Sequence, residues 1–159
     1  MKKGVGVREA GDEGEVHVFA GIVEAVTLIG STAVGGGSVH HARFQLSSKM
    51  ALLARCEGTE IFQELDVREI VGKVLTDNGI PAGQQEWKLS GSYPKREYCV
   101  QYDESALAFV SRLLEEEGIY YHAERRDDGE HLIFEDDSTV APPIEGSEEL
   151  PFRQRTGME

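Results

Sequence analysis

The chain has 159 residues, of which 40% are hydrophobic and 28% charged, and its formal net charge is −13. This length allows one domain or two small lobes with a real core, and the apolar content is too high for a mostly disordered protein. Apolar runs fall short of the roughly 20 residues that cross a bilayer, the opening lacks a signal peptide's apolar stretch, and the basic residues are scattered. We therefore expect a cytoplasmic protein that binds no nucleic acid and does not insert stably into a membrane.

The first third of the chain predicts a tail followed by two paired strands. Residues 1–15 are rich in Gly, Glu and Asp and are expected to be a disordered tail or an expression remnant. The runs Val16–Leu28 and Val39–Ser47 flank a glycine-rich stretch, which predicts a long hairpin around a flexible glycine loop. Phe44 and Leu46 share one face of the second run, so we expect that strand to be half buried.

The clearest predicted helix begins after Asp66 and ends before Gly79. Asp66 is a good N-cap, and Glu69 stands three residues later, as in a capping box. Gly79 is expected as the left-handed residue that ends the helix, and Pro81 prevents its continuation. The apolar residues recur at helical spacing and form one face: Val67, Ile70, Val71, Val74 and Leu75.

A second amphipathic helix is predicted over Glu104–Glu117, with Asp103 as its N-cap and Gly118 as the residue that ends it. The preceding run Tyr98–Tyr102 alternates as a strand does, which places both tyrosines and Val100 on one face. The helix's apolar sector contains Ala106, Leu107, Phe109, Val110, Leu113 and Leu114.

A β-hairpin is expected after the second helix. Its first strand begins with Ile119–Glu124, and Asp128-Gly129 predicts a type I′ turn into a second strand over His131–Asp136. Residues 138–159 contain three prolines and show no clear period. We expect them to form a linker or the start of a further lobe.

Three consecutive acids, Glu115–Glu117, crowd the end of the second helix. The helix dipole is negative there, so each acid costs a few tenths of a kcal/mol. One explanation is pairing with Arg112, Arg125 or Arg126, and the other is a contact across a subunit boundary. The sequence leaves both open. The candidate interface residues are Glu115, Glu116, Glu117 and Arg112.

The residue pattern predicts no catalytic, cofactor or metal site. His40 and His41 fall on opposite faces of a strand, and Cys56 and Cys99 match neither metal nor redox spacing, so we expect reduced, buried thiols. Two alternatives from other classes are a small hydrolase that uses paired acids and a generic ligand-binding α+β module. Nothing marks the available carboxylates as desolvated: Glu104, Glu117, Asp136 and Asp137.

The segment YPKREYCVQYDESALAFVSRLLEEEGIYYHAE (Tyr93–Glu124), followed by HLIFEDD, closely resembles VgrG spike proteins of bacterial type VI secretion systems. The upstream pieces FAGIVEAV, HHARFQLS and EIFQELDVREIVGKVLTDNGI match the same family in the same order. The resemblance covers residues 18–137 and rests on several ordered blocks. This family in turn is similar to the central baseplate hub of contractile phage tails, the late control D family.

The resemblance implies an α+β, phage tail hub-like fold, in which partial antiparallel β-barrel lobes carry two inserted amphipathic helices. Residues 16–64 are then the C-terminal part of the first β-barrel lobe. Residues 65–137 form a helix–strand–helix–hairpin hub lobe. The chain is expected to be a hub-region fragment whose incomplete barrel leaves strand edges for another chain or lobe to cover.

The resemblance also implies a structural role and no enzymatic activity. Full-length members are homotrimers that dock on a hexameric tube protein (Hcp) and are delivered out of the cell on contraction. Through regions that this chain lacks, they carry a PAAR tip protein and effectors across membranes. A phage tail baseplate hub is the alternative within the same reading, since this segment does not separate the two origins.

Overall fold

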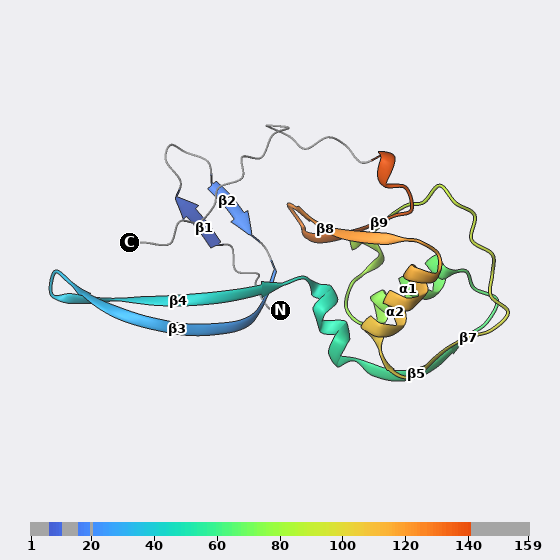
Figure 1. The fold of residues 1–159 in the computed structure, drawn as a ribbon, viewed down its shortest axis with the longest axis horizontal. Coiled ribbons are helices and arrows are strands. Elements are labelled where there is room, and N and C mark those ends of the chain that lie inside the picture. The colour runs from blue at the N-terminus through green and yellow to red at the C-terminus, as the bar shows by residue number, and fades with distance from the viewer. Residues whose placement is uncertain (1–6, 11–15, 20, 141–159) are drawn as a thin grey trace, which may run out of the picture.

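The computed structural model describes residues 7–10, 16–19 and 21–140. A long β-arm projects from a lobe in which two helices lie between two sheets (Figure 1). The arm pairs β3 (Ile22–Val34) with β4 (Gly37–Ser47) in antiparallel fashion. A separate antiparallel pair joins β1 (Val7–Ala10) to β2 (Val16–Phe19). The predicted hairpin is therefore present as β3 and β4, but its first strand begins at Ile22, because Val16–Phe19 of the predicted run pairs with β1 instead.

The strands of the arm extend further than the sequence predicts. They continue through most of the glycine-rich stretch and turn at Gly35 and Gly36, whose φ angles are +56° and +84°. Glycine adopts such angles without the steric cost that a side chain adds, so two residues are enough for the turn. The predicted flexible loop is thus a tight turn.

The prediction of a half-buried second strand is wrong for most of its length. On this strand Val39 and Phe44 are each 48% exposed, while Leu46 near the lobe is half buried. Alternation in a sequence indicates that a strand has two different faces, but it does not supply the layer that covers one of them. In the part of the chain that the structure describes, the outer arm has no such layer.

The lobe contains the remaining elements. In chain order they are η1 (Lys49–Arg55), β5 (Glu57–Phe62), α1 (Val67–Asp77), η2 (Ala82–Gln84), β6 (Gln85–Lys88), β7 (Cys99–Ser105), α2 (Ala106–Glu116), β8 (Tyr120–Arg126), β9 (Gly129–Glu135) and η3 (Ser138–Val140). The β5–β7 pair is antiparallel and lies on one side of the helices, and the sheet β6-β9-β8 lies on the other (Figure 1). β6 runs parallel to β9, a pairing that the sequence analysis did not anticipate.

Helix α1 forms as predicted. The Asp66 carboxylate accepts a hydrogen bond from the Glu69 amide, and the Glu69 side chain accepts one from the Asp66 amide, which completes the capping box. Gly79 follows the helix at a φ of +88°. The five residues of the predicted apolar face are all buried.

Helix α2 begins two residues later than predicted, and its cap is a different residue. β7 continues to Ser105, whose hydroxyl accepts a hydrogen bond from the Ala108 amide and caps the helix. Asp103, the predicted cap, lies inside β7 at a φ of +46°. The strand persists because it pairs with β5 as far as Glu57, a contact distant in sequence. Gly118 ends the helix at a φ of +69°, as predicted.

The β8–β9 hairpin is present, but its turn is shifted. Arg126 pairs with Gly129, so Asp127 and Asp128 are the two loop residues. A type I′ turn needs positive φ at both loop residues, yet Gly129 alone has it here, at +135°. The prediction of a type I′ turn centred on Asp128-Gly129 is therefore wrong.

One hydrophobic core fills the space between the sheets and the helices. Phe62 on β5 stacks on Phe109 of α2 with ring centroids 5.5 Å apart, and Trp87 on β6 stacks on Phe134 of β9 at 4.1 Å. Cys99 is buried and Cys56 half buried, and both are free thiols. The described strands form four separate sheets of two or three strands, and none of these closes into a barrel.

Candidate functional site

The glutamates at the end of α2 lie against Arg96, a residue that the sequence analysis did not consider. The Arg96 guanidinium donates to Glu116 at 2.8 Å and to Glu117 at 2.7 Å. The Arg96 amide also donates to the Leu65 carbonyl oxygen, which fixes the backbone of this arginine beside the start of α1. A single arginine of the same chain therefore pairs with two of the three glutamates.

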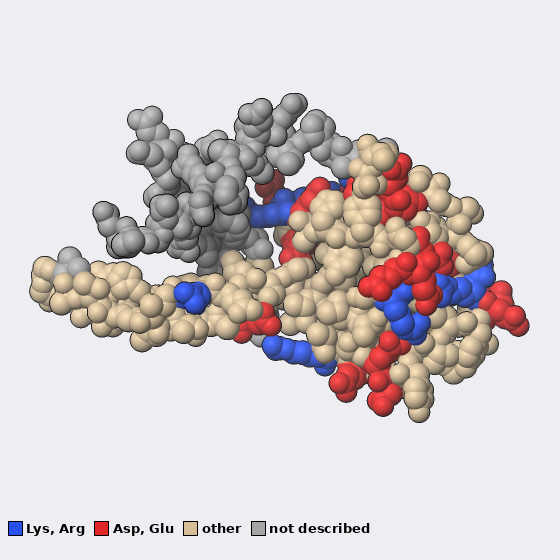
Figure 2. Space-filling model, in the orientation of Figure 1, with Lys and Arg blue, Asp and Glu red and all other residues tan. Residues whose placement is uncertain are grey.

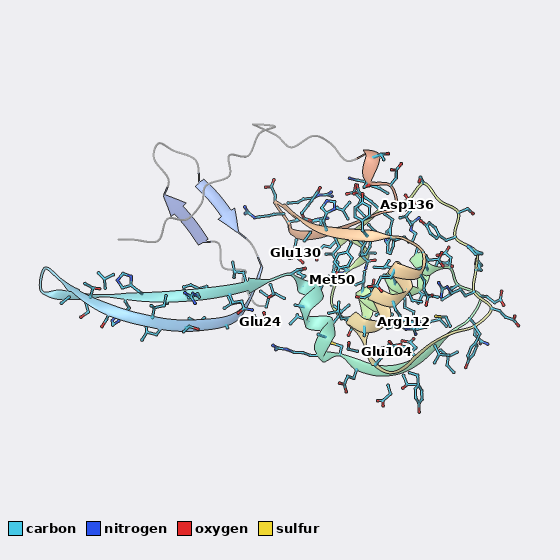
Figure 3. The ribbon with its side chains drawn as sticks, in the orientation of Figure 1. Glu24, Met50, Glu104, Arg112, Glu130 and Asp136 are labelled. Atoms are coloured by element: carbon cyan, nitrogen blue, oxygen red, sulfur yellow. The ribbon has the colours of Figure 1, made fainter. Side chains whose placement is uncertain are left out.

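Arg112 contributes little to that neutralisation. It reaches Glu116 only at 3.9 Å, while it donates to Glu104 at 2.8 Å and to the Val100 carbonyl oxygen at 2.7 Å. It also lies over the Phe109 ring, 4.9 Å from the centroid. Hydrogen bonding to Glu104 raises the pKa of Arg112. This arginine ties α2 to β7, and Figure 3 shows it beside Glu104.

Glu115 differs from its two neighbours. It is exposed, and it forms no ion pair with any residue in the described ranges. Arg126, a second predicted partner of the glutamates, pairs instead with Glu86 and Glu124. Of the four candidate interface residues, Glu115 is thus the one whose charge is free of a described partner.

Asp136 holds a loop and is poorly suited to acid–base catalysis. Its carboxylate accepts hydrogen bonds from the amides of Ser90 at 2.9 Å and Gly91 at 2.7 Å, and from the Tyr93 hydroxyl at 2.8 Å. The backbone amides keep the pKa of Asp136 well below its usual range. Burial, assisted by the bond to Asp136, raises the pKa of Tyr93 to about 12.

The other carboxylates considered for a paired-acid mechanism are also occupied. Glu104 binds Arg112, Glu117 binds Arg96, and the Thr139 hydroxyl donates to Asp137 at 2.6 Å and lowers its pKa. A general acid at neutral pH needs a raised carboxyl pKa. Ion pairs and donated hydrogen bonds of this kind favour the charged carboxylate instead.

The described ranges show few features of other kinds of site. They contain no cluster of three or more His, Cys, Asp or Glu side chains arranged for a metal ion. A groove of about 630 Å³ between α1 and β6 is open and lined partly by charged residues, including Asp66, Lys73 and Asp77. It is not the enclosed apolar pocket that a ligand-binding module would show. No helix in the described ranges is long and apolar enough to cross a membrane.

The base of the arm is fixed to the lobe by one acidic side chain. Glu130 on β9 accepts hydrogen bonds from the Ser48 hydroxyl at 2.8 Å and the Lys49 amide at 2.9 Å (Figure 3). Lys49 also donates to Gln84 at 2.6 Å. Nearby, Glu24 on β3 accepts from Gln45 and Ser47 of β4. Side-chain hydrogen bonds therefore hold the base of the arm, whereas no described layer covers the outer arm.

Within the described ranges, the lobe is packed around one core and a β-arm projects from it. The carboxylates considered for catalysis make structural contacts. The whole chain, residues 1–159, matches the family model described as the phage tail baseplate hub (GPD). The chain belongs to this family, and the predicted resemblance is confirmed.

The chain is similar to two spike proteins of the type VI secretion system from Pseudomonas aeruginosa. It is 48% identical to VgrG5 over 104 residues, which cover 65% of this chain and 13% of that protein. It is 42% identical to VgrG4b over 119 residues, which cover 74% of this chain and 15% of that protein. The chain thus spans a small part of the length of the curated relatives that it matches.

A solved structure gives the same result for the fold. The E. coli c3393 protein matches with a TM-score of 0.69 and 31% identity, over 77% of this chain and 34% of that one. That protein is described as a component of the type VI secretion system with structural similarity to the T4 bacteriophage tail proteins gp27 and gp5. The fold is therefore phage tail hub-like, and its described part combines strands with α1 and α2.

Proposed function

We propose that this chain is the hub part of a type VI secretion spike and acts structurally, without enzymatic activity. The observation that carries the proposal is the match of the full chain to the baseplate hub family. Two relatives described as spike proteins support the secretion system over a phage tail. The structural commitment of Glu104, Glu117, Asp136 and Asp137 weighs against the hydrolase alternative.

In this proposal the arm belongs to a β-barrel lobe that other strands complete. A two-stranded hairpin in water is marginally stable, and its outer edges can each accept another strand. Residues 16–64 would then be the C-terminal part of the first barrel lobe and residues 65–137 the hub lobe. The completing strands come from another part of the same protein or from a neighbouring subunit.

The partners proposed for the assembly follow from the family. The full-length protein is a homotrimer that docks on a hexameric Hcp-like tube, carries a PAAR tip and effectors through other regions, and is delivered on contraction. The experiment measures the mass of the full chain by light scattering, alone and with a hexameric tube protein. We expect a complex of higher mass. If the chain and the tube elute separately at every concentration, the proposed docking is wrong.

We also propose that the end of α2 contacts a neighbouring subunit, chiefly through Glu115. Glu115→Lys should reduce the assembled mass while leaving the unfolding midpoint unchanged, because Glu115 has no described ion pair to lose. Glu117→Lys is a poorer test, since it also breaks the bond from Arg96.

Asp127→Lys is the matched control, since it reverses an exposed acid in the β8–β9 turn. An assembled mass that Glu115→Lys leaves unchanged would remove α2 from the subunit boundary. If Glu115→Lys and Asp127→Lys reduced the assembled mass equally, the cause would be the change in net charge and not a local contact of Glu115.

A further inference from the structure

The outer face of the β5–β7 sheet is apolar and exposed. Its inner face carries Phe62 and Cys99, which are buried in the lobe core. On the outer face Ile61 pairs with Val100. Tyr102 lies two positions further along β7, and Tyr98 lies directly before the strand, two positions before Val100. The exposed fractions are 55% for Ile61, 57% for Tyr98 and 76% for Tyr102.

The backbone of β7 is distorted where Tyr102 projects. Gly58 pairs with Glu104 and Glu60 with Gln101, so Tyr102 and Asp103 together oppose the single residue Thr59. Asp103 has a φ of +46°, and its amide donates to the Thr59 hydroxyl at 3.2 Å. Bulges of this kind redirect a side chain, and strained non-glycine residues cluster at functional sites.

Acidic residues flank this face without local neutralisation. Four of them lie in or next to β5 and β7, and none forms an ion pair with a described residue: Glu57, Glu64, Glu97 and Asp103. The nearby bases have other partners, since Lys73 binds Glu60, Arg96 binds Glu117 and Arg112 binds Glu104. Arg55, just before β5, is the exception. Figure 2 shows acidic side chains along the edge of the lobe where Figure 1 places β5.

We propose that this face docks a partner protein segment with apolar side chains at its centre and lysine or arginine around them. Exposed tyrosines are favoured anchors at protein interfaces, and an acidic rim selects a basic surface. The same face of a second copy is disfavoured as the occupant, because it carries the same acidic rim. The inference concerns this surface alone and does not require the spike function.

The test titrates the full chain, labelled with ¹⁵N, with a short capped peptide in which lysine alternates with valine and tyrosine. We expect amide shifts confined to β5 and β7. Tyr98→Ser with Tyr102→Ser should weaken binding about tenfold or more, because both anchors are lost. Glu97→Gln with Asp103→Asn should weaken it severalfold and reduce its dependence on salt.

The control variants remove the same chemistry elsewhere. Leu28→Ser with Phe44→Ser takes two exposed apolar side chains from the arm, and Asp127→Asn removes an acid from the β8–β9 turn. Both should bind the peptide within about twofold of the parent chain. Undisturbed α2 amides in every variant show that the lobe is folded.

Three outcomes would overturn the proposal. The first is equal binding of a peptide with glutamate in place of lysine. The second is full affinity in the tyrosine variant, which would mean attraction to net charge alone. The third is amide shifts centred outside β5 and β7, or none at millimolar peptide.

Discussion

At the scale of single residues, Asp136 anchors a loop. It accepts hydrogen bonds from two consecutive backbone amides and from Tyr93, and so fixes the loop between β6 and β7 to the end of β9. Hydrogen bonds to an ionised carboxylate are stronger than those between neutral groups, so the loop depends on this side chain.

We therefore predict that Asp136→Asn lowers the melting temperature at neutral pH. The folded carboxyl has a lowered pKa, so its stabilising contribution is present above about pH 4, the value for an unfolded aspartate, and is lost as the pH falls through the folded pKa. The difference in melting temperature between the variant and the parent chain should consequently shrink in acid. Asp127→Asn should cause no such loss. A constant difference at every pH would contradict this mechanism.

The same variant should also change Tyr93. Burial is the main cause of its raised pKa of about 12, and the Asp136 bond is the second. Removing the negative charge should lower the Tyr93 pKa, yet leave it above the usual tyrosine value because the burial remains. An ultraviolet absorbance titration of the tyrosinate band measures this. An unchanged Tyr93 transition would show that the carboxylate has no influence on this hydroxyl.

At the scale of elements, two residues can be compared as the cap of α2. The sequence predicts Asp103, and the structure has Ser105. Ser105→Ala should lower the free energy of unfolding by about 1 kcal/mol, because the Ala108 amide loses its acceptor. Asp103→Asn should leave it nearly unchanged, since the Asp103 side chain caps no helix and asparagine tolerates a positive φ. Urea unfolding of both variants measures the difference. If Asp103→Asn lowered the free energy of unfolding more than Ser105→Ala does, Asp103 would be the cap, as the sequence predicts.

The two helices show which parts of an element can be predicted from sequence. All the signals for α1 lie within the element and its flanks, from Asp66 to Gly79, and each is confirmed. The start of α2 depends on the pairing of Ser105 with Glu57, far away in the chain. Local rules chose Asp103 because they cannot detect that pairing.

The candidate site illustrates the same limit. The excess of acid at Glu115–Glu117 was visible in the sequence, because it breaks a local rule of helix charge. Its main partner, Arg96, was not, because it lies 20 residues before Glu116 and is brought there by the Leu65 contact. The alternation in Tyr98–Tyr102 predicts that both tyrosines share one face. It does not predict that this face is exposed, because exposure depends on what packs against it.

At the scale of the whole molecule, stability is distributed unevenly. The buried apolar residues belong to the lobe, while the described arm contributes long strands that bury little. Hydrophobic burial is the main favourable term in folding, so the lobe is expected to carry most of the free energy of unfolding. The contacts of Glu130 with Ser48 and Lys49 hold the arm's base, but they do not extend along the strands.

Hydrogen exchange should reveal this division. Amides of the outer arm, including those of Leu28 and Phe44, should exchange far faster than those of the buried turns of α1 and α2, because opening the arm exposes little new apolar surface. If other strands complete a barrel on the arm, their addition should slow its exchange and leave the helices unchanged. Arm amides as protected as those of α2 in the isolated chain would mean that the hairpin is stable without further strands. The hub would then be assembled from two independently stable parts instead of a lobe and an arm that a partner completes.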